Sequence, residues 1–389
     1  MERERPLRIL MVLESDFTHR GGGGAESQVR TLARHLIGRG QPVAIVTPLF
    51  AFGPQVRAER SSGIPVGRLR YPRVPVLGAG VMCLRLAAFL LGRGRRYDAW
   101  HVHIAHHMGA VTCLVGALVG KPVVVKVSGW WELEKGVMAK DRGLLDALAH
   151  RLLKRGAAFQ AISTRIAAEL VRQGFPAERI IVLPNAVDTS RFSARRAGRA
   201  PGAPFTAVFV GRLVPEKGLG TLLAAWARAF EGRKDARLRL VGEGRLEAEL
   251  RAQARALGIA EEVEFLGHHG KVEEILATAD VGVLPSNIEG LSNTLLEFMA
   301  SGLPTIATRV SGSEDFVVTG RNGWLFDPGD VDALAAHLGA AATLPAAALD
   351  ELGRRARADV EQASALEHVT GRLLELYRGT PPHVLAKAS

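Results

Sequence analysis

The most informative part of this sequence is PSNIEGLSNTLLEFMASGLP, residues 285–304. Short apolar runs of strand length flank it, at residues 281–284 and 305–307. Within it, residues 294–300 have the apolar spacing of a helix, and Ser292 or Asn293 can cap the helix start. A strand, a loop, a helix and a second strand in this order predict a βαβ unit, whose two strands are parallel.

The same order of elements recurs on both sides of this stretch. We expect strands at residues 7–13, 43–47, 99–103, 123–127, 158–162 and 180–183, and again at residues 205–210, 238–241, 263–266, 281–284 and 305–307. Helical spacing separates them, at residues 25–38, 144–154, 164–173, 220–230, 246–257, 272–278 and 294–300. This pattern predicts an α/β protein with two Rossmann-like, doubly wound domains that face each other across a ligand-binding cleft.

A break in composition separates the two sets of elements. Residues 189–204, TSRFSARRAGRAPGAP, are small, polar, basic and proline-containing, as linkers are. We therefore expect an N-terminal acceptor-binding domain at residues 1–188, the linker at 189–204 and a C-terminal donor-binding domain at 205–357. The remainder, residues 358–389, would contain a last helix over residues 358–377 and a tail.

Composition excludes several classes of protein. With 47% hydrophobic and 23% charged residues, the chain is not disordered throughout. Its two cysteines, Cys83 and Cys113, are too few for a disulfide framework and lack metal-ligand spacing. Nothing before Ile9 has the pattern of a signal peptide, and no apolar run reaches the roughly 20 residues of a membrane-spanning helix. We expect a cytoplasmic protein, either soluble or peripheral at the inner face of the plasma membrane.

Positive charge is concentrated in the first half of the chain. Residues 1–185 contain 27 Lys and Arg against 13 Asp and Glu, a balance of +14, and the rest contains 23 against 26, a balance of −3. Residues 81–96 combine an apolar run with four arginines, which suits an anionic membrane surface, or equally a core helix with a basic end. Nucleic acid is the other partner that basic charge suggests, but no recognition module supports it.

Two loops between a strand and a helix have the composition of anion sites. VGRLVPEKG, residues 210–218, places Arg212 and Lys217 just before a helix N-terminus, where two cations and the helix dipole can converge on a diphosphate. RGGGGAE, residues 20–26, includes Gly23 and Gly24, which let the backbone approach a ligand closely. Each loop alone could equally be an ordinary surface turn.

The third candidate site is the pair of glutamates in residues 285–304. Glu289 lies in the loop, and Glu297 lies within the helix among apolar residues, where an unpaired carboxylate would be costly. Carboxylates can accept hydrogen bonds from sugar hydroxyls, while the amides of residues 291–293 at the helix start can bind a phosphate. A polyol joined to an anion fits this arrangement.

Taken together, these pieces resemble the retaining nucleotide-sugar glycosyltransferases of group 1, or family 4, which have the GT-B fold. The matching motifs are GGAE at 23–26, PNAVD at 184–188, VGRLVPEKG at 210–218, LVGEG at 240–244, FLGH at 265–268 and EGLSNTLLEFMASGLP at 289–304. Their order and spacing match over nearly the whole chain. The glutamate pair with its GLP ending is the specific part, and the glycine-rich pieces are not specific.

The resemblance implies a role for each matching residue. Arg212 and Lys217 would bind the donor diphosphate, Glu297 the ribose hydroxyls and Glu289 the hydroxyls of the transferred sugar. The catalytic residues would be Glu289, Arg212 and Lys217. The remaining donor contacts would come from Gly23, Gly24, Gly290, Leu291, Ser292 and Asn293. The last helix would cross back onto the N-terminal domain.

The resemblance also implies the reaction. A hexosyl group would pass from a nucleoside-diphosphate sugar to a glycan or a lipid-linked acceptor, with retention at the anomeric carbon, in cell-envelope or exopolysaccharide biosynthesis. The donor is a substrate, with a UDP-sugar favoured and a GDP-sugar as the alternative, so no cofactor is expected. No metal is expected either, because Asp330 and Asp332 form a D-x-D sequence only at the start of a late helix, where capping explains them.

One departure from the family pattern affects the site. Members commonly have a histidine after the strand that corresponds to residues 123–127, and this chain has Ser128 there. A serine hydroxyl can hydrogen-bond a sugar but is no base near neutral pH. Among the histidines of HVHIAHH, His103 is the one that could contact the acceptor or the sugar in its place, but a structural role for His103 is favoured.

Other functions stay open at this point. A non-catalytic subunit that binds the donor without turnover is one, because of Ser128. A sugar-nucleotide epimerase of similar fold is another, and it would consume the donor with no acceptor present. A dehydrogenase is disfavoured, since neither glycine cluster has the dinucleotide-binding spacing.

Overall fold

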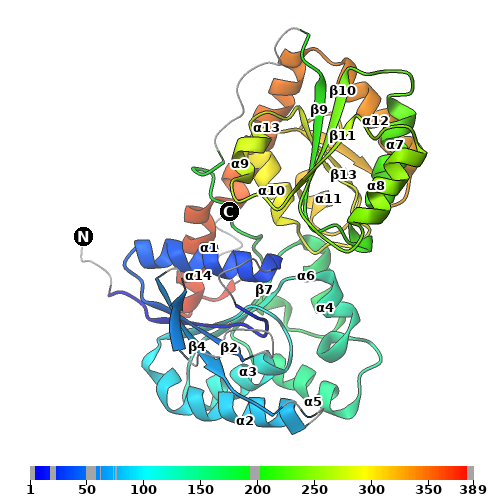
Figure 1. The fold of residues 1–389 in the computed structure, drawn as a ribbon. Helices are drawn as coiled ribbons and strands as arrows, with labels where there is room; N and C mark the ends of the chain where they lie inside the picture. The colour runs from blue at the N-terminus through cyan, green and yellow to red at the C-terminus, as the bar shows by residue number, and fades with distance from the viewer. Residues whose placement is uncertain are drawn as a thin grey trace. The chain divides into compact units, whose positions relative to one another are not determined.

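The computed structural model describes residues 5–17, 23–49, 58–61, 63–72, 74, 77–192 and 202–382, without the side chain of residue 131. The chain forms two compact units. The first unit comprises Met1–Ala186 together with Leu366–Ser389, and the second comprises Val187–Ala365. Figure 1 shows helices and strands alternating along the chain in each unit, and each unit is considered by itself below.

The first unit is built on an eight-stranded sheet in the order β3-β4-β2-β1-β5-β6-β7-β8. All neighbouring strands are parallel except β3 and β4. Its strands are β1 (Ile9–Val12), β2 (Val43–Pro48), β3 (Ala58–Ser61), β4 (Ile64–Leu69), β5 (Ala99–Val102), β6 (Val123–Val127), β7 (Ala158–Ala161) and β8 (Ile180–Val182). The central strands are buried on both faces, which parallel sheets with helices on each side require.

Helices cover both faces of this sheet. They are α1 (Gly24–Gly38), α2 (Leu77–Leu91), α3 (His107–Val119), α4 (Trp130–Glu134), α5 (Leu144–Leu153), α6 (Thr164–Arg172) and α14 (Leu366–Tyr377), with short 3₁₀ turns η1 (Arg93–Arg96), η2 (Gly136–Met138) and η3 (Ala177–Arg179). Helices α1 and α14 pack against each other and share one hydrophobic core with β1, β2 and β4. Helix α3 packs between α2 and α5.

The second unit has a six-stranded, fully parallel sheet in the order β11-β10-β9-β12-β13-β14. Its strands are β9 (Phe205–Val210), β10 (Ala236–Val241), β11 (Val263–Gly267), β12 (Val281–Leu284), β13 (Thr305–Thr308) and β14 (Gly323–Phe326). Its helices are η4 (Pro215–Lys217), α7 (Leu219–Ala229), α8 (Glu247–Ala256), α9 (Val272–Leu276), α10 (Asn293–Ala300), α11 (Ser313–Phe316), α12 (Val331–Thr343) and α13 (Ala346–Ser364).

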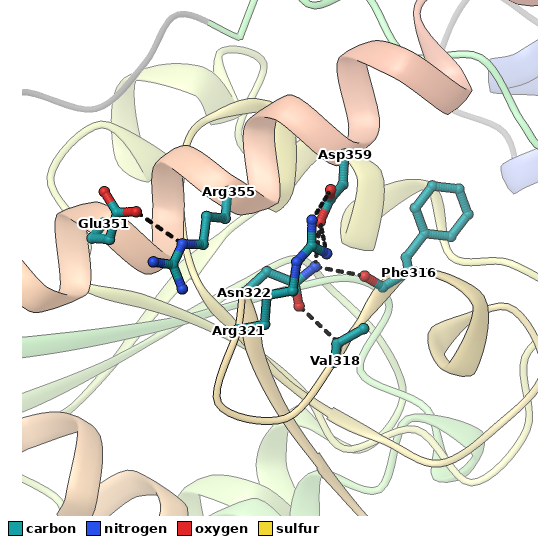
Figure 2. Close-up of polar contacts among 7 residues, drawn as sticks. All are labelled: Phe316, Val318, Arg321, Asn322, Glu351, Arg355 and Asp359. Atoms are coloured by element: carbon teal, nitrogen blue, oxygen red, sulfur yellow. Dashed lines mark hydrogen bonds and ion pairs between the residues drawn. The ribbon is translucent and has the colours of Figure 1, made fainter.

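Polar contacts fasten helix α13 to the loop before β14, as Figure 2 shows. Arg321 and Asp359 form two hydrogen bonds of 2.7 Å, and Asn322 Nδ2 donates to Asp359 Oδ2 at 2.7 Å. The buried amide of Asn322 also donates to the carbonyl oxygen of Phe316 and accepts from the backbone N–H of Val318. A fully paired buried amide of this kind holds the loop in one conformation.

The predicted fold class is confirmed: both units are doubly wound α/β structures. The last helix differs from the prediction over residues 358–377, since it is two helices that break at Ala365. There the backbone N–H of Val187 donates to the carbonyl oxygen of Ser364 at 2.8 Å, and Val187 forms a β-bridge with Ala365. Because Ala365 is extended, the helix cannot continue through it, and only α14 belongs to the first unit.

The observed units also divide the chain at slightly different places from the predicted domains. The N-terminal stretch of the first unit ends at Ala186, two residues before the predicted boundary, and the chain returns to this unit at Leu366. Of the predicted linker at 189–204, residues 193–201 lie outside the described part of the chain.

Among the described residues no single helix is long and apolar enough to cross a membrane. Helices α12 and α13 together reach that length and composition, but they are bent by 116° relative to each other.

Candidate functional site

The candidate site in the second unit lies where the order of its strands reverses. Strand β9 is followed in the chain by β10 on one side, whereas β12, on its other side, is followed by β13 and β14. The loops that leave the carboxyl ends of β9 and β12 therefore lie next to each other, at the position where open α/β sheets bind ligands. The backbone N–H of Asn287 donates to the carbonyl oxygen of Glu216 at 2.8 Å and ties the two loops together.

Gly218 allows these two loops to approach closely. Its φ of 63° lies in the left-handed region, and a Cβ at this position would lie 2.0 Å from the carbonyl oxygen of Pro285. Only glycine meets both conditions. The close approach places Lys217, the preceding residue, against the loop that carries Glu289.

Lys217 and Glu289 meet in this site. The Lys217 ammonium group forms an ion pair with Glu289 Oε1, and Ser286 Oγ donates to the same oxygen at 3.0 Å. The two side chains are only 19% and 16% exposed, so the pair is partly shielded from water. Arg212, at the start of the β9 loop, is exposed, and within the described part of the chain its guanidinium has no hydrogen-bond or ion-pair partner. The site thus holds one paired cation and one available cation.

Helix α10 begins beside this pair. Ser292 is its N-cap residue, as predicted, but the Ser292 side chain makes no capping hydrogen bond. Gly290 and Leu291, just before it, are buried and pack against Gly312 of the loop after β13, where a Cβ would come within 2.6 Å of the Gly290 carbonyl oxygen. The helix start, which carries partial positive charge, is therefore held in place by the loop that follows the next strand.

Glu297 lies one helical turn further along α10, in different surroundings from Glu289. Nearby, Arg191 Nε and Nη2 donate to Glu273 Oε2 at 3.1 and 2.8 Å. Burial raises the pKa of the Glu297 carboxyl to about 7; Arg191 opposes this rise and Glu273 adds to it. No described residue forms a hydrogen bond or an ion pair with the Glu297 carboxylate. A partly buried carboxylate without a partner is costly and is suited to a ligand that brings hydroxyl donors.

In the first unit, the predicted glycines lie at the start of α1. Gly23 is the N-cap residue of this helix and Gly24 its first residue. Two residues later the buried Glu26 accepts a hydrogen bond from Ser15 Oγ, in the loop after β1. The other part of the predicted glycine loop, residues 20–22, lies outside the described residues.

Ser128 contacts the backbone of His103 and not its imidazole ring. Ser128 Oγ donates to the carbonyl oxygen of His103 at 2.6 Å, and the Ser128 N–H donates to Glu132 Oε1 at 2.9 Å. The His103 side chain is 1% exposed, its ring lies 4.0 Å from that of His101, and burial holds its pKa well below the usual value. The burial favours the structural alternative for His103 over a sugar contact.

Two buried ionisable side chains, Lys126 and Glu132, lie in the same part of the first unit and interact electrostatically. Burial lowers the pKa of Lys126, on β6, to about 7, and burial raises the pKa of Glu132 to about 7. Glu132 Oε2 also accepts from the backbone N–H of Ala105 at 2.9 Å. The sequence did not point to these two residues, because Lys126 is a single charged residue in an otherwise apolar strand.

Sequence reasoning also missed the residues that surround the two glutamates. Ser286 precedes Glu289 by three residues and could have been noticed from that spacing. Arg191 and Glu273 could not, because they are 82 residues apart and meet only in the folded unit. The capping role predicted for Asp330 is confirmed: its side chain accepts from the Ala333 N–H at 2.9 Å. The other acid of that D-x-D sequence, Asp332, forms an ion pair with Arg228.

Two family models match the chain, one in each unit. Residues 204–343 match the model described as glycosyl transferases group 1, and residues 23–186 match the glycosyl transferase 4-like domain. A 2-deoxystreptamine N-acetyl-D-glucosaminyltransferase from Streptomyces fradiae is 30% identical in an alignment 386 positions long, which covers 89% of this chain and 90% of that protein. WcaL of Escherichia coli K12, named for colanic acid biosynthesis, is 34% identical in an alignment over 219 residues. This alignment covers 54% of this chain and 54% of WcaL, so the chain matches about half the length of that relative.

Solved structures share the fold at lower identity. HepE from Anabaena, crystallised with UDP, has a TM-score of 0.75 and 20% identity, with 95% of this chain and 99% of that chain covered. A glycosyltransferase from Rickettsia africae has a TM-score of 0.79 and 15% identity, with 96% and 98% covered. At these identities the likeness concerns the fold.

Proposed function

Because the chain belongs to the group 1 glycosyltransferases and has their GT-B fold of two Rossmann-like α/β domains, we propose that it transfers a hexosyl group from a nucleoside-diphosphate sugar to a glycan or lipid-linked acceptor. The proposed transfer retains the configuration at the anomeric carbon and serves cell-envelope or exopolysaccharide biosynthesis. A UDP-sugar is the favoured donor, and HepE, which has this fold, was crystallised with UDP-glucose.

The observation that carries this proposal is the pairing of Lys217 with Glu289 at the strand-order reversal of the second unit. A sugar diphosphate combines an anion with hydroxyl donors, so it can separate this pair and satisfy both members. The diphosphate would take Lys217 together with Arg212, and the sugar hydroxyls would take Glu289. Glu297, in its partly buried position, would accept from the ribose hydroxyls.

In the proposed reaction the bond between the anomeric carbon and the diphosphate oxygen breaks. Negative charge grows on the departing diphosphate, and Arg212, Lys217 and the start of α10 stabilise it more than they stabilise the intact donor. The acceptor hydroxyl attacks from the same face, and its proton leaves with the diphosphate. In this proposal Arg212 and Lys217 supply the positive charge that a metal ion supplies in other glycosyltransferases. The D-x-D aspartates are engaged elsewhere, since Asp330 caps helix α12 and Asp332 pairs with Arg228.

We further propose that the first unit binds the acceptor and lies against the inner face of the plasma membrane. Helices α2 and α5, which flank α3, expose large apolar side chains: Leu84 is 72% exposed and Leu144 is 92% exposed. Three arginines of η1 follow α2 and suit anionic lipid headgroups. Co-sedimentation with vesicles tests this surface: we expect binding to phosphatidylglycerol vesicles that is lost in L84E/L144E, and equal binding to phosphatidylcholine would contradict it.

Incubating the chain with a panel of UDP- and GDP-sugars tests the proposed activity. We expect slow hydrolysis of one donor in the presence of EDTA, with the sugar first released in the configuration of the donor, and faster turnover when an acceptor is added. Epimerised donor would identify an epimerase instead. Saturable donor binding without hydrolysis or transfer to any acceptor would favour the non-catalytic subunit.

The raised pKa of Glu297 predicts that donor binding depends on pH. Its raised pKa of about 7 means that the carboxylate able to accept two ribose hydroxyls is lost as the pH falls through 7. We therefore expect UDP-glucose to bind roughly tenfold more weakly at pH 6 than at pH 8. Calorimetric titration measures this, and UDP-glucose is suitable because its diphosphate does not titrate in this range.

The variant Glu297→Gln separates this effect from others. It keeps the shape of the side chain but cannot ionise, so its affinity should be low and equal at both pH values. In the original chain, Glu297 should make the folded state less stable as the pH rises from about 4.5 to 7, because in this range the folded chain binds a proton that the unfolded chain has released. Glu297→Gln should remove this fall in stability. An unchanged pH profile of binding in Glu297→Gln would remove Glu297 from the donor site.

A further inference from the structure

A second cluster of polar side chains lies in the first unit, outside the predicted donor site. Glu14 follows strand β1, and His106 and His107 lie at the start of helix α3, just after β5. Strands β1 and β5 are neighbours at the place where the strand order of this sheet reverses. The cluster therefore occupies the position in the first unit where α/β sheets bind ligands.

Three potential metal-ligand atoms converge in this cluster. Glu14 Oε1 lies 2.8 Å from His106 Nδ1, and His106 Nδ1 lies 3.2 Å from His107 Nδ1. Glu14, His106 and His107 each offer one atom, and the three lie within 4.8 Å of one another. Two ligands about 2.1 Å from a tetrahedral zinc ion are about 3.4 Å apart, so a slight expansion would admit an ion.

The surrounding contacts orient these ligands. His107 Nε2 lies 3.0 Å from Asp146 Oδ1, on α5, which fixes the proton on Nε2 and leaves the lone pair on Nδ1. Glu14 Oε2 accepts from the Met108 N–H at 2.7 Å, so the carboxylate is held in place by helix α3. His106 Nε2 faces Gly136, where a Cβ would come within 2.7 Å, and its Nδ1 is the nitrogen turned to the cluster.

Hydrogen bonds alone satisfy this arrangement poorly. A single proton on His106 Nδ1 would have to serve both Glu14 Oε1 and the lone pair of His107 Nδ1. A divalent cation would serve all three ligand atoms at once. The side chains are 14% to 33% exposed, so an ion could reach them from solvent.

We propose that Glu14, His106 and His107 bind a divalent transition-metal ion of the zinc class. Two imidazoles and one carboxylate are the ligand set of such ions, and three protein ligands leave a coordination position open to water or a hydroxyl group. Asp146 is a positioning residue, which acts through His107. The proposal does not rest on the proposed transfer reaction, and the site lies in a different unit from Lys217 and Arg212.

Metal titration of the full-length, untagged chain after treatment with EDTA tests this site. We expect one Zn²⁺ per chain by calorimetry and one Co²⁺ per chain, with a visible absorption band that Zn²⁺ removes. His107→Ala should abolish the band, and Asp146→Asn should weaken Zn²⁺ binding by about 10- to 100-fold. His269→Ala, an exposed histidine of the second unit, is the matched control and should bind as the original chain does.

Glu14 is left unchanged in this test, because it also accepts from the backbone of α3 and its loss would affect folding. Circular dichroism on each variant confirms that the chain is folded. Absence of a stoichiometric ion, or equal binding by the original chain and folded His107→Ala, would overturn the proposal. Donor hydrolysis in EDTA is measured separately, so failure of the metal site and failure of the proposed transfer are distinguishable.

Discussion

Replacement of Lys217 by alanine is expected to lower the rate of sugar transfer by about 10²- to 10³-fold, a loss typical of removing one group that stabilises developing negative charge. Lys217 is the partly buried cation of the site, and it faces the Glu289 carboxylate across two loops. Without it, the departing diphosphate retains only Arg212 and the start of α10. Steady-state kinetics with the donor found by the panel would show the loss mainly in kcat.

The matched control for Lys217→Ala is Arg228→Ala. This substitution also removes a cation from the second unit, but Arg228 is exposed and pairs with an exposed Asp332. Its effect on transfer should be small, as surface ion pairs contribute little. If Lys217→Ala and Arg228→Ala transferred sugar at similar rates, Lys217 would have no part in the departure of the diphosphate.

Glu289→Ala should lower transfer by at least about 100-fold for a different reason. In this structure Glu289 accepts from both Lys217 and Ser286, and in the donor complex we expect it to accept from the hydroxyls of the transferred sugar. The variant loses the sugar contact but frees Lys217. Titration should therefore show UDP binding at least as tightly as before, while the extra affinity of the UDP-sugar over UDP disappears.

Glu351→Ala is the control for this variant. Glu351 is an exposed acid on α13 that pairs with Arg355, as Figure 2 shows, and its loss should leave both affinities unchanged. A Glu289→Ala variant that kept the preference for the UDP-sugar over UDP would contradict the proposed sugar contact, whatever its rate of transfer.

The sequence predicted the fold well because parallel strands buried on both faces are short continuous apolar runs. Strands β1, β5, β6, β9 and β12 were all found in this way. The antiparallel edge strand β3, Ala58–Ser61, was missed, since three of its four residues are polar and only Ser61 is buried. The break at Ala365 was missed as well, because it depends on a β-bridge to Val187, a residue far away in the sequence.

The sequence predicted which residues belong to the candidate site, but not which of them contact each other. The motifs gave Lys217 and Glu289 separately, yet the two are 72 residues apart, and nothing in either motif indicates that they form an ion pair. The cluster of Glu14, His106 and His107 shows the same limit. Two of its members are adjacent in the sequence, and the third is brought to them only by the pairing of β1 with β5.

The most direct test is a crystal structure of the chain with a bound UDP-sugar. We expect the diphosphate oxygens within about 2.7 to 3.2 Å of Lys217 Nζ and of the Arg212 guanidinium, with a sugar hydroxyl on Glu289 in place of the present ion pair. A nucleotide bound elsewhere, with Lys217 and Glu289 still paired, would contradict the account.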